Sequence, residues 1–91
     1  LHTWVGMTRV RIYTTLDCPY CVRAKRLLEA RGIGFEEIDV SHDPALRAEL
    51  VERTGRRTVP QIFIDDRAIG GYEDLARMDS RGELRDLAAL A

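Results

Sequence analysis

The sequence predicts a small α/β domain in which a four-stranded mixed sheet is flanked by helices, in the order β-α-β-α-β-β-α. Three observations support this prediction. A chain of 91 residues has room for one domain. Segments in which every second residue is apolar follow one another along the chain with segments of helical periodicity between them. Residues typical of turns and helix caps separate these segments. Because a helix separates the first two strands, they are expected to pair in parallel through a right-handed crossover, with helices on both faces of the sheet.

The first half of the chain is predicted to form a strand, a helix and a second strand. Residues 9–14 alternate polar and apolar side chains and include β-branched ones, which is typical of a strand. A helix is expected over 19–31, because Pro19 suits a first helical turn, apolar residues then recur at helical spacing, and Gly32 suits the end. Residues 33–40 are a weaker strand candidate, since their apolar side chains change phase halfway.

The second half contains a helix, a hairpin and a closing helix. Asp43 and Pro44 are an N-cap and a first-turn proline, and Gly55 marks the end of this helix. Asp65 and Asp66 are typical of a tight turn between two short strands. The predicted elements are a helix over 43–55, strands over 61–64 and 67–69, and a closing helix over 72–89 with a break near 80–82.

Composition excludes several classes of protein. The chain has 14 basic and 15 acidic residues, so its net charge of −1 argues against nucleic acid as a partner. No uncharged run approaches the roughly 18 apolar residues of a membrane span. A hydrophobic share of 45% and a charged share of 32% are typical of a folded, soluble domain.

The first residues of the chain lack the features of a secretory signal. Residues 1–6 contain no basic region and no long apolar region. Met7 resembles a natural start, so we interpret residues 1–6 as an N-terminal extension or a cloning remnant and residues 7–91 as the domain. The expected compartment is the reducing cytoplasm, where a cysteine pair is more often catalytic than structural.

The two cysteines, Cys18 and Cys21, are the candidate catalytic residues. They flank Pro19 and Tyr20 in a motif that follows a predicted strand and begins a predicted helix. A three-residue spacing on a helix brings both sulfurs to one face. Cys18 would meet the unpaired N–H groups at the helix start, which favour the thiolate, the attacking species. Cys21, one turn further along, is suited to resolve a mixed disulfide.

Two other interpretations of the cysteine pair are weaker. Zinc requires four ligands, and the two histidines, His2 and His42, are isolated from each other. No metal site is therefore predicted. A purely structural disulfide is disfavoured by the expected cytoplasmic setting.

From Met7 to its C-terminus, the chain resembles a bacterial dithiol glutaredoxin. The resemblance is carried by CPYC at 18–21, TVP at 58–60 and GGYEDL at 70–75, which occur in the family's order and spacing. It implies a thioredoxin fold and glutathione-dependent reduction of glutathione mixed disulfides and protein disulfides. Glutathione would be a co-substrate, with no tightly bound cofactor. The bond before Pro60 is expected to be cis.

The resemblance also implies a glutathione-binding surface. Its predicted residues are Tyr20, Arg57, Thr58, Val59, Pro60, Gly71, Tyr72, Glu73 and Asp74. The γ-glutamyl carboxylate would meet backbone N–H groups of Glu73 or Asp74, and its ammonium the Asp74 carboxylate. Arg56 or Arg57 would hold the glycyl carboxylate, since a guanidinium suits that geometry. Without the resemblance, a hairpin end, a helix cap and solvated loop charges explain the same residues.

Two positions beside the first cysteine depart from the family's pattern. Thr15 stands where glutaredoxins usually carry a lysine, and Asp17 where they often carry a threonine. The first change removes a cation and the second adds a carboxylate. Both are expected to make the Cys18 thiolate less favourable than in relatives, with Arg57 partly replacing the lysine.

Two alternative functions remain open at this point. One is an NrdH-type redoxin that thioredoxin reductase reduces, and the other is a carrier of a glutathione-ligated [2Fe–2S] cluster, which the proline after Cys18 disfavours within the family. The expected partners are glutathione and glutathionylated or disulfide-containing proteins, with ribonucleotide reductase among those that the resemblance allows. Neither nucleic acid nor a membrane is expected to bind, and the chain is expected to be a monomer.

Overall fold

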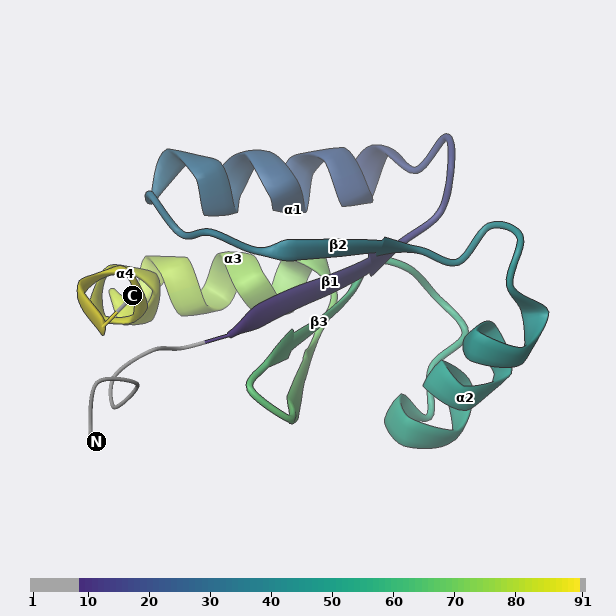
Figure 1. The fold of residues 1–91 in the computed structure, drawn as a ribbon. Helices are drawn as coiled ribbons and strands as arrows, with labels where there is room; N and C mark the ends of the chain where they lie inside the picture. Colours follow the sequence, from purple (N-terminus) through teal and green to yellow (C-terminus); the bar gives the residue numbers. More distant parts are fainter. Residues whose placement is uncertain (1–8, 91) are drawn as a thin grey trace, which may run out of the picture.

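Eight helices and strands make up residues 9–90, the part of the chain that this computed structural model describes. In chain order they are β1 (Val10–Thr14), α1 (Pro19–Ala30), β2 (Glu36–Asp39), α2 (Pro44–Thr54), β3 (Gln61–Ile64), β4 (Arg67–Gly70), α3 (Tyr72–Ser80) and α4 (Glu83–Leu90) (Figure 1). This order confirms the predicted one, with the closing segment divided into two helices at the predicted break. The assignment of residues 1–6 as an extension and of Met7 as a start lies outside the described residues.

The four strands form one mixed sheet in the order β2-β1-β3-β4. β1 pairs with β2 in parallel and with β3 antiparallel, and β3 pairs antiparallel with β4. The parallel pair is the one predicted from the strand–helix–strand segment. The central strands β1 and β3 are largely buried, whereas the edge strands β2 and β4 are mostly exposed.

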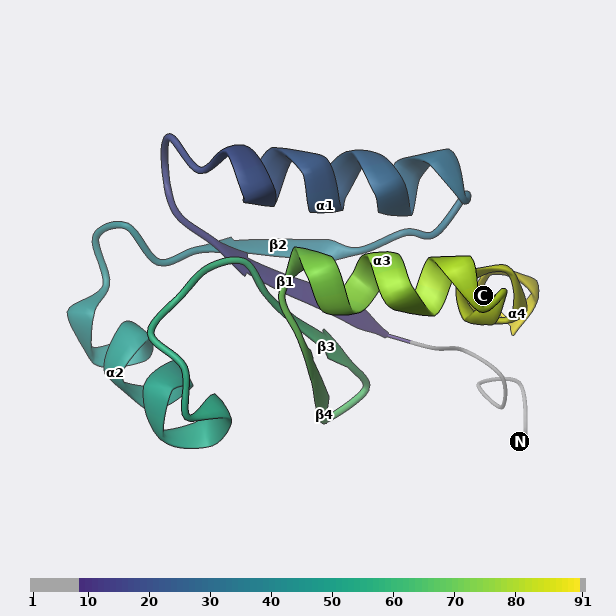
Figure 2. The same cartoon turned by 180° about the vertical axis from the view of Figure 1, so that it is seen from behind.

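Helices cover both faces of this sheet, and two apolar clusters fill the space beneath them. On one face, Ile12 and Ile62 pack with Leu28 of α1, Leu75 of α3 and Leu84 of α4. The other face is covered by α2, and its cluster consists of Tyr13, Val40, Leu50 and Phe63. In Figures 1 and 2, α1 and α3 lie near each other, and α2 lies on the opposite side of the sheet from them.

The second strand is shorter than predicted. β2 begins at Glu36, because the residues before it close the end of α1: Gly32 has φ +71°, and the Ile33 N–H donates to Leu28 O at 2.9 Å. The change of apolar phase has a simple cause. Ile33 belongs to the α1 side of the core, whereas Ile38 packs on the α2 side.

Strand direction brings three distant segments to one end of the sheet. β1 ends there, the antiparallel β3 begins there, and β4, antiparallel to β3, ends there. The segments next to these strand ends are 15–18, 58–60 and 71–74. They contain the motifs singled out in the sequence.

None of the helices between residues 9 and 90 is long and apolar enough to cross a membrane.

The buried face of α1 gives a stability prediction. Leu28 is 0% exposed, so Leu28→Ala should lower the free energy of unfolding by about 2–5 kcal/mol through lost burial and a residual cavity. Urea unfolding measures this value. Glu29→Ala, an exposed neighbour on the same helix, is the control and should change it by less than about 0.5 kcal/mol. Equal effects of the two substitutions would contradict the packing described here.

Candidate active site

The sulfur of Cys18 lies at the start of α1 and caps that helix. Cys18 is the N-cap residue, and its Sγ accepts a hydrogen bond from the Cys21 N–H at 3.2 Å. Pro19 occupies the first turn, where no N–H is needed. Asp17, with φ +55°, lies one residue before the cap and is exposed. The sulfur therefore occupies the position of a capping side chain at the N-terminus of α1.

Cys21 lies one turn further into α1 and is 2% exposed, whereas Cys18 is partly exposed. Burial, reinforced by a hydrogen bond to Cys18, raises the pKa of Cys21 to about 12. Both side chains are free thiols. Cys21 is therefore a protonated thiol at neutral pH. Within residues 9–90, no group of three His, Cys, Asp or Glu side chains is placed to hold a metal ion.

The 58–60 loop faces this cysteine pair. The Cys18 thiol donates to Val59 O at 3.7 Å, and the Val59–Pro60 bond is cis, as the family resemblance implies. Gln61 supports the loop from below: it is 1% exposed, and its Nε2 donates to Thr58 O at 2.9 Å. The sequence predicts only a strand position for Gln61, since nothing in the local pattern indicates that its amide reaches back to the loop.

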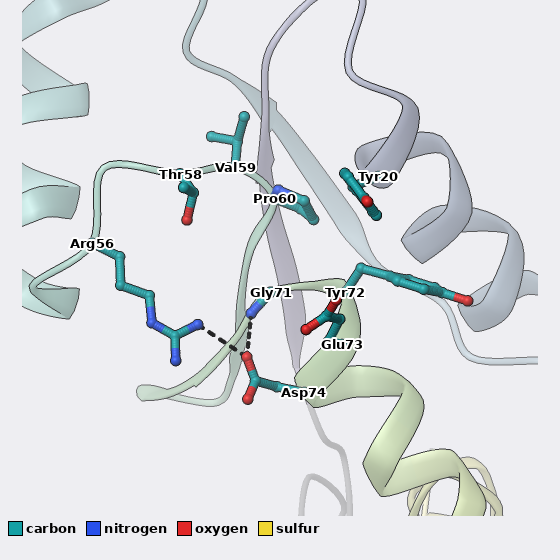
Figure 3. A pocket seen from close by; sticks show the side chains of 9 residues that line it. All are labelled: Tyr20, Arg56, Thr58, Val59, Pro60, Gly71, Tyr72, Glu73 and Asp74. Atoms are coloured by element: carbon teal, nitrogen blue, oxygen red, sulfur yellow. Dashed lines mark hydrogen bonds and ion pairs between the residues drawn. The ribbon is translucent and has the colours of Figure 1, made fainter.

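A pocket of about 300 Å³ opens beside the cysteine pair (Figure 3). Its lining consists of Tyr20, Arg56, Thr58, Val59, Pro60, Gly71, Tyr72, Glu73 and Asp74. Every residue of the predicted glutathione surface lines it except Arg57; Arg56, the neighbour before it, takes part instead. Tyr20 and Tyr72 contribute the aromatic side, with ring centroids 6.2 Å apart.

The polar side of the pocket is organised around the carboxylate of Asp74. Its Oδ2 accepts hydrogen bonds from the Gly71 N–H at 2.9 Å and from Arg56 Nη1 at 3.0 Å (Figure 3). Its Oδ1 pairs with Arg77. These contacts, with the Gly71 N–H contributing most, hold the pKa of Asp74 below its usual value. The carboxylate is therefore ionised at neutral pH.

Close packing at the corner between β4 and α3 requires glycine. Gly70 has φ +111°, and a Cβ built there would lie 2.1 Å from Asp74 Oδ2. A side chain at position 70 would therefore displace the carboxylate. The conformation and the contact both explain why the chain has glycine before the N-cap of α3.

Together these residues surround a space with a defined chemical character. The pocket lining presents the Arg56 guanidinium paired with the Asp74 carboxylate, the Glu73 carboxylate lies near them, and the Val59 carbonyl contacts the Cys18 sulfur. Such an arrangement suits a small molecule that has both cationic and anionic groups. The same arrangement allows thiol–disulfide exchange at Cys18.

Comparison with known proteins agrees with this chemistry. The sequence model of the glutaredoxin family matches residues 10–69. Glutaredoxin 3 of Escherichia coli (strain K12) is 51% identical over 81 residues, which cover 89% of this chain and 98% of that protein. A glutaredoxin of Pseudomonas aeruginosa is 49% identical over 78 residues, covering 86% of this chain and 93% of its own.

Solved structures show the same fold. The solution structure of glutaredoxin from Brucella melitensis superposes with a TM-score of 0.81 at 51% identity, covering 91% of this chain and 90% of the other. The crystal structure of a buckwheat glutaredoxin–glutathione complex superposes with a TM-score of 0.83 at 28% identity, covering 92% and 79%. The thioredoxin-type fold expected from the sequence is thereby confirmed.

The difference in burial between the two cysteines predicts a difference in reactivity. In the reduced, folded protein at pH 7, iodoacetamide should alkylate Cys18 and leave Cys21 unmodified, because Cys21 is buried and protonated. Below its pKa of about 12, Cys21 should react about tenfold faster for each added pH unit. Mass spectrometry of the labelled peptides measures both rates. Equal labelling of the two at neutral pH would contradict this geometry.

Proposed function

The chain belongs to the glutaredoxin family of thiol–disulfide oxidoreductases. We propose that it uses glutathione to reduce glutathione mixed disulfides and protein disulfides. The observation that carries the proposal is the pocket beside the cysteine pair, whose lining includes the ion pair between Arg56 and Asp74 and therefore presents both signs of charge. Glutathione matches it, since it has two carboxylates, one ammonium and a thiol. The reaction belongs in the cytoplasm, where glutathione is kept largely reduced.

The proposed reaction begins at Cys18. Its thiolate attacks the glutathione sulfur of a mixed disulfide, so the substrate's S–S bond breaks and a new one joins Cys18 to glutathione. The substrate sulfur leaves as a thiolate and takes a proton from water. A second glutathione thiolate then attacks the bound glutathione sulfur, which frees Cys18 and forms glutathione disulfide.

Protein disulfides follow a related path that needs the second cysteine. Cys18 first forms a mixed disulfide with the protein, and Cys21 then attacks the Cys18 sulfur. This step releases the substrate as a dithiol and leaves a Cys18–Cys21 disulfide. Two molecules of glutathione reduce that disulfide and are oxidised in turn.

Binding of glutathione would use the charges already described. We place its γ-glutamyl carboxylate at the N–H groups that begin α3 and its ammonium at Asp74. The buckwheat glutaredoxin of similar fold was crystallised as a complex with glutathione, which supports glutathione as the ligand. A guanidinium would hold the glycyl carboxylate, and Arg56 is the better candidate because it lines the pocket.

Substitutions of the two cysteines should have different effects on activity in an assay coupled to glutathione reductase. Cys18→Ser should reduce deglutathionylation to background, because the nucleophile is lost, whereas Cys21→Ser should retain most of it. Reduction of a protein disulfide should require both residues. Supply of electrons by thioredoxin reductase, with none from glutathione, would instead favour an NrdH-type redoxin. Full activity of Cys18→Ser would disprove the scheme.

Arg56 and Arg57 are adjacent, so each serves as the matched control for the other. Arg56→Ala should raise the KM for a glutathionylated peptide about tenfold, the effect of losing one charge-assisted hydrogen bond. Arg57→Ala should change it little, because Arg57 is exposed and lies outside the pocket lining. Steady-state kinetics at fixed ionic strength measures both. The reverse result would restore the role that the sequence assigned to Arg57.

A further inference from the structure

A second groove borders the cysteine pair and shares no residue with the glutathione pocket. Its lining consists of Thr14, Thr15, Leu16, Asp17, Cys18, Pro19, Cys21, Val22, Lys25, Glu37 and Asp39. The proposed function assigns this groove no role. Both cysteines border it, and its only cation is Lys25.

The Lys25 side chain is anchored at this groove. Lys25 lies on α1 four residues after Cys21, which places the two on the same face of the helix. Its Nζ donates to Glu37 Oε2 at 3.0 Å, and the same oxygen accepts a hydrogen bond from Thr14 Oγ1 at 2.8 Å. Thr14 is 2% exposed, so Glu37 is held from beneath by a buried hydroxyl.

The ammonium of Lys25 retains donors for another group. It has three N–H bonds, and Glu37 accepts one of them in the described part of the chain. The Lys25 side chain is 29% exposed, so its charge is only partly screened by water. Hydrogen bonding to Lys25 is the main cause that lowers the pKa of Glu37, so the Glu37 carboxylate is ionised at neutral pH.

The resolving step requires a charge to form beside this groove. Cys21 must lose its proton before it can attack the Cys18 sulfur, and burial opposes that loss. A fixed cation nearby offsets part of this penalty. Burial is the largest effect on the pKa of Cys21 and raises it, a backbone hydrogen bond with Thr15 lowers it, and the positive charge of Lys25 lowers it further by a smaller amount.

We propose that Lys25, held in place by Glu37, stabilises the Cys21 thiolate as it forms and thereby accelerates closure of the Cys18–Cys21 disulfide. In this role Lys25 is a positioning residue, because it acts only through the Cys21 thiolate. It has no part in the first attack, which is made by Cys18. The inference rests on the proposed function when the group bonded to the Cys18 sulfur is glutathione. When another thiol is bonded to Cys18, the inference does not depend on glutathione.

The proposed step balances in atoms and charge. The Cys21 proton passes to water in the groove, and the Cys21 sulfur forms a bond with the Cys18 sulfur. The bond between Cys18 and its partner breaks, and the partner leaves as a thiolate that takes a proton from solvent. No outside oxidant is needed, because the mixed disulfide is the oxidant.

Other charged groups also face the groove and belong in the account of its pH dependence. They are Asp17 in the loop before α1, the Cys18 sulfur at its start, and Glu37 and Asp39 on β2. The acidic groups disfavour a new thiolate, and among the described residues that line the groove Lys25 is the charged group that opposes them. Removal of Lys25 should therefore leave the resolving step with unfavourable charges alone.

The test uses dithiobisnitrobenzoate, an aromatic disulfide whose leaving thiolate is coloured. Stopped-flow mixing with the reduced protein should give two releases: a first when Cys18 attacks, and a second, independent of reagent concentration, when Cys21 displaces the thiolate from Cys18. Lys25→Met should slow the second release about three- to tenfold at pH 7, equivalent to a pKa rise of roughly 0.5–1 unit. Its pH profile should move to higher pH.

Two further variants keep the result interpretable. Lys25→Arg should restore most of the second rate, because it restores the charge. Arg26→Met removes a cation from the adjacent, exposed position of α1, outside the groove, and should leave the second rate unchanged. An unchanged first release in Lys25→Met shows that the substitution affects the second step and leaves the attack by Cys18 intact.

Two outcomes would overturn the inference: an unchanged second rate in Lys25→Met, or an equal loss in Arg26→Met. Either result can occur whether or not the protein uses glutathione, because the reagent contains none. Conversely, lack of glutathione-coupled activity in the unaltered protein would defeat the proposed function and leave the Lys25 result standing.

Discussion

The hydrogen bond from the Cys21 N–H to the Cys18 sulfur is the contact on which the rest of the site depends. It places the first sulfur at the positive end of α1, and it sets the second one turn deeper, where burial keeps its proton in place. The two thiols therefore have different chemistry although they are three residues apart. A disulfide exchange that proceeds in order, first at one sulfur and then at the other, follows from this difference.

Charge is distributed around the pair in two separate arrangements. On the pocket side, Asp74 is held by the N–H of Gly71 and by two arginines, so its carboxylate is fixed before any ligand arrives. On the groove side, Lys25 is held by Glu37. Each arrangement belongs to a different step of the proposed cycle: the pocket binds the tripeptide, and the groove assists the second cysteine.

Much of this could be predicted from sequence because the signals are local. The proline, the cysteine spacing and Gly32 locate α1, and Asp43 with Gly55 locates α2. Contacts between segments that are distant in the sequence are harder to predict from it. The choice between Arg56 and Arg57 depends on how the loop before Thr58 turns, and the structure directs Arg56 toward Asp74. The reach of Gln61 and the Lys25–Glu37 pair likewise require tertiary structure, since their partners lie on other segments.

The corner at Gly70 has a consequence for protein engineering. Because the Asp74 carboxylate occupies the space that a side chain at position 70 would need, the hairpin and the start of α3 cannot be altered independently. A designer who wishes to transplant this binding surface into another scaffold must carry the strand end, the turn and the first helical turn together as one cassette. Libraries that randomise the hairpin should leave that glycine untouched.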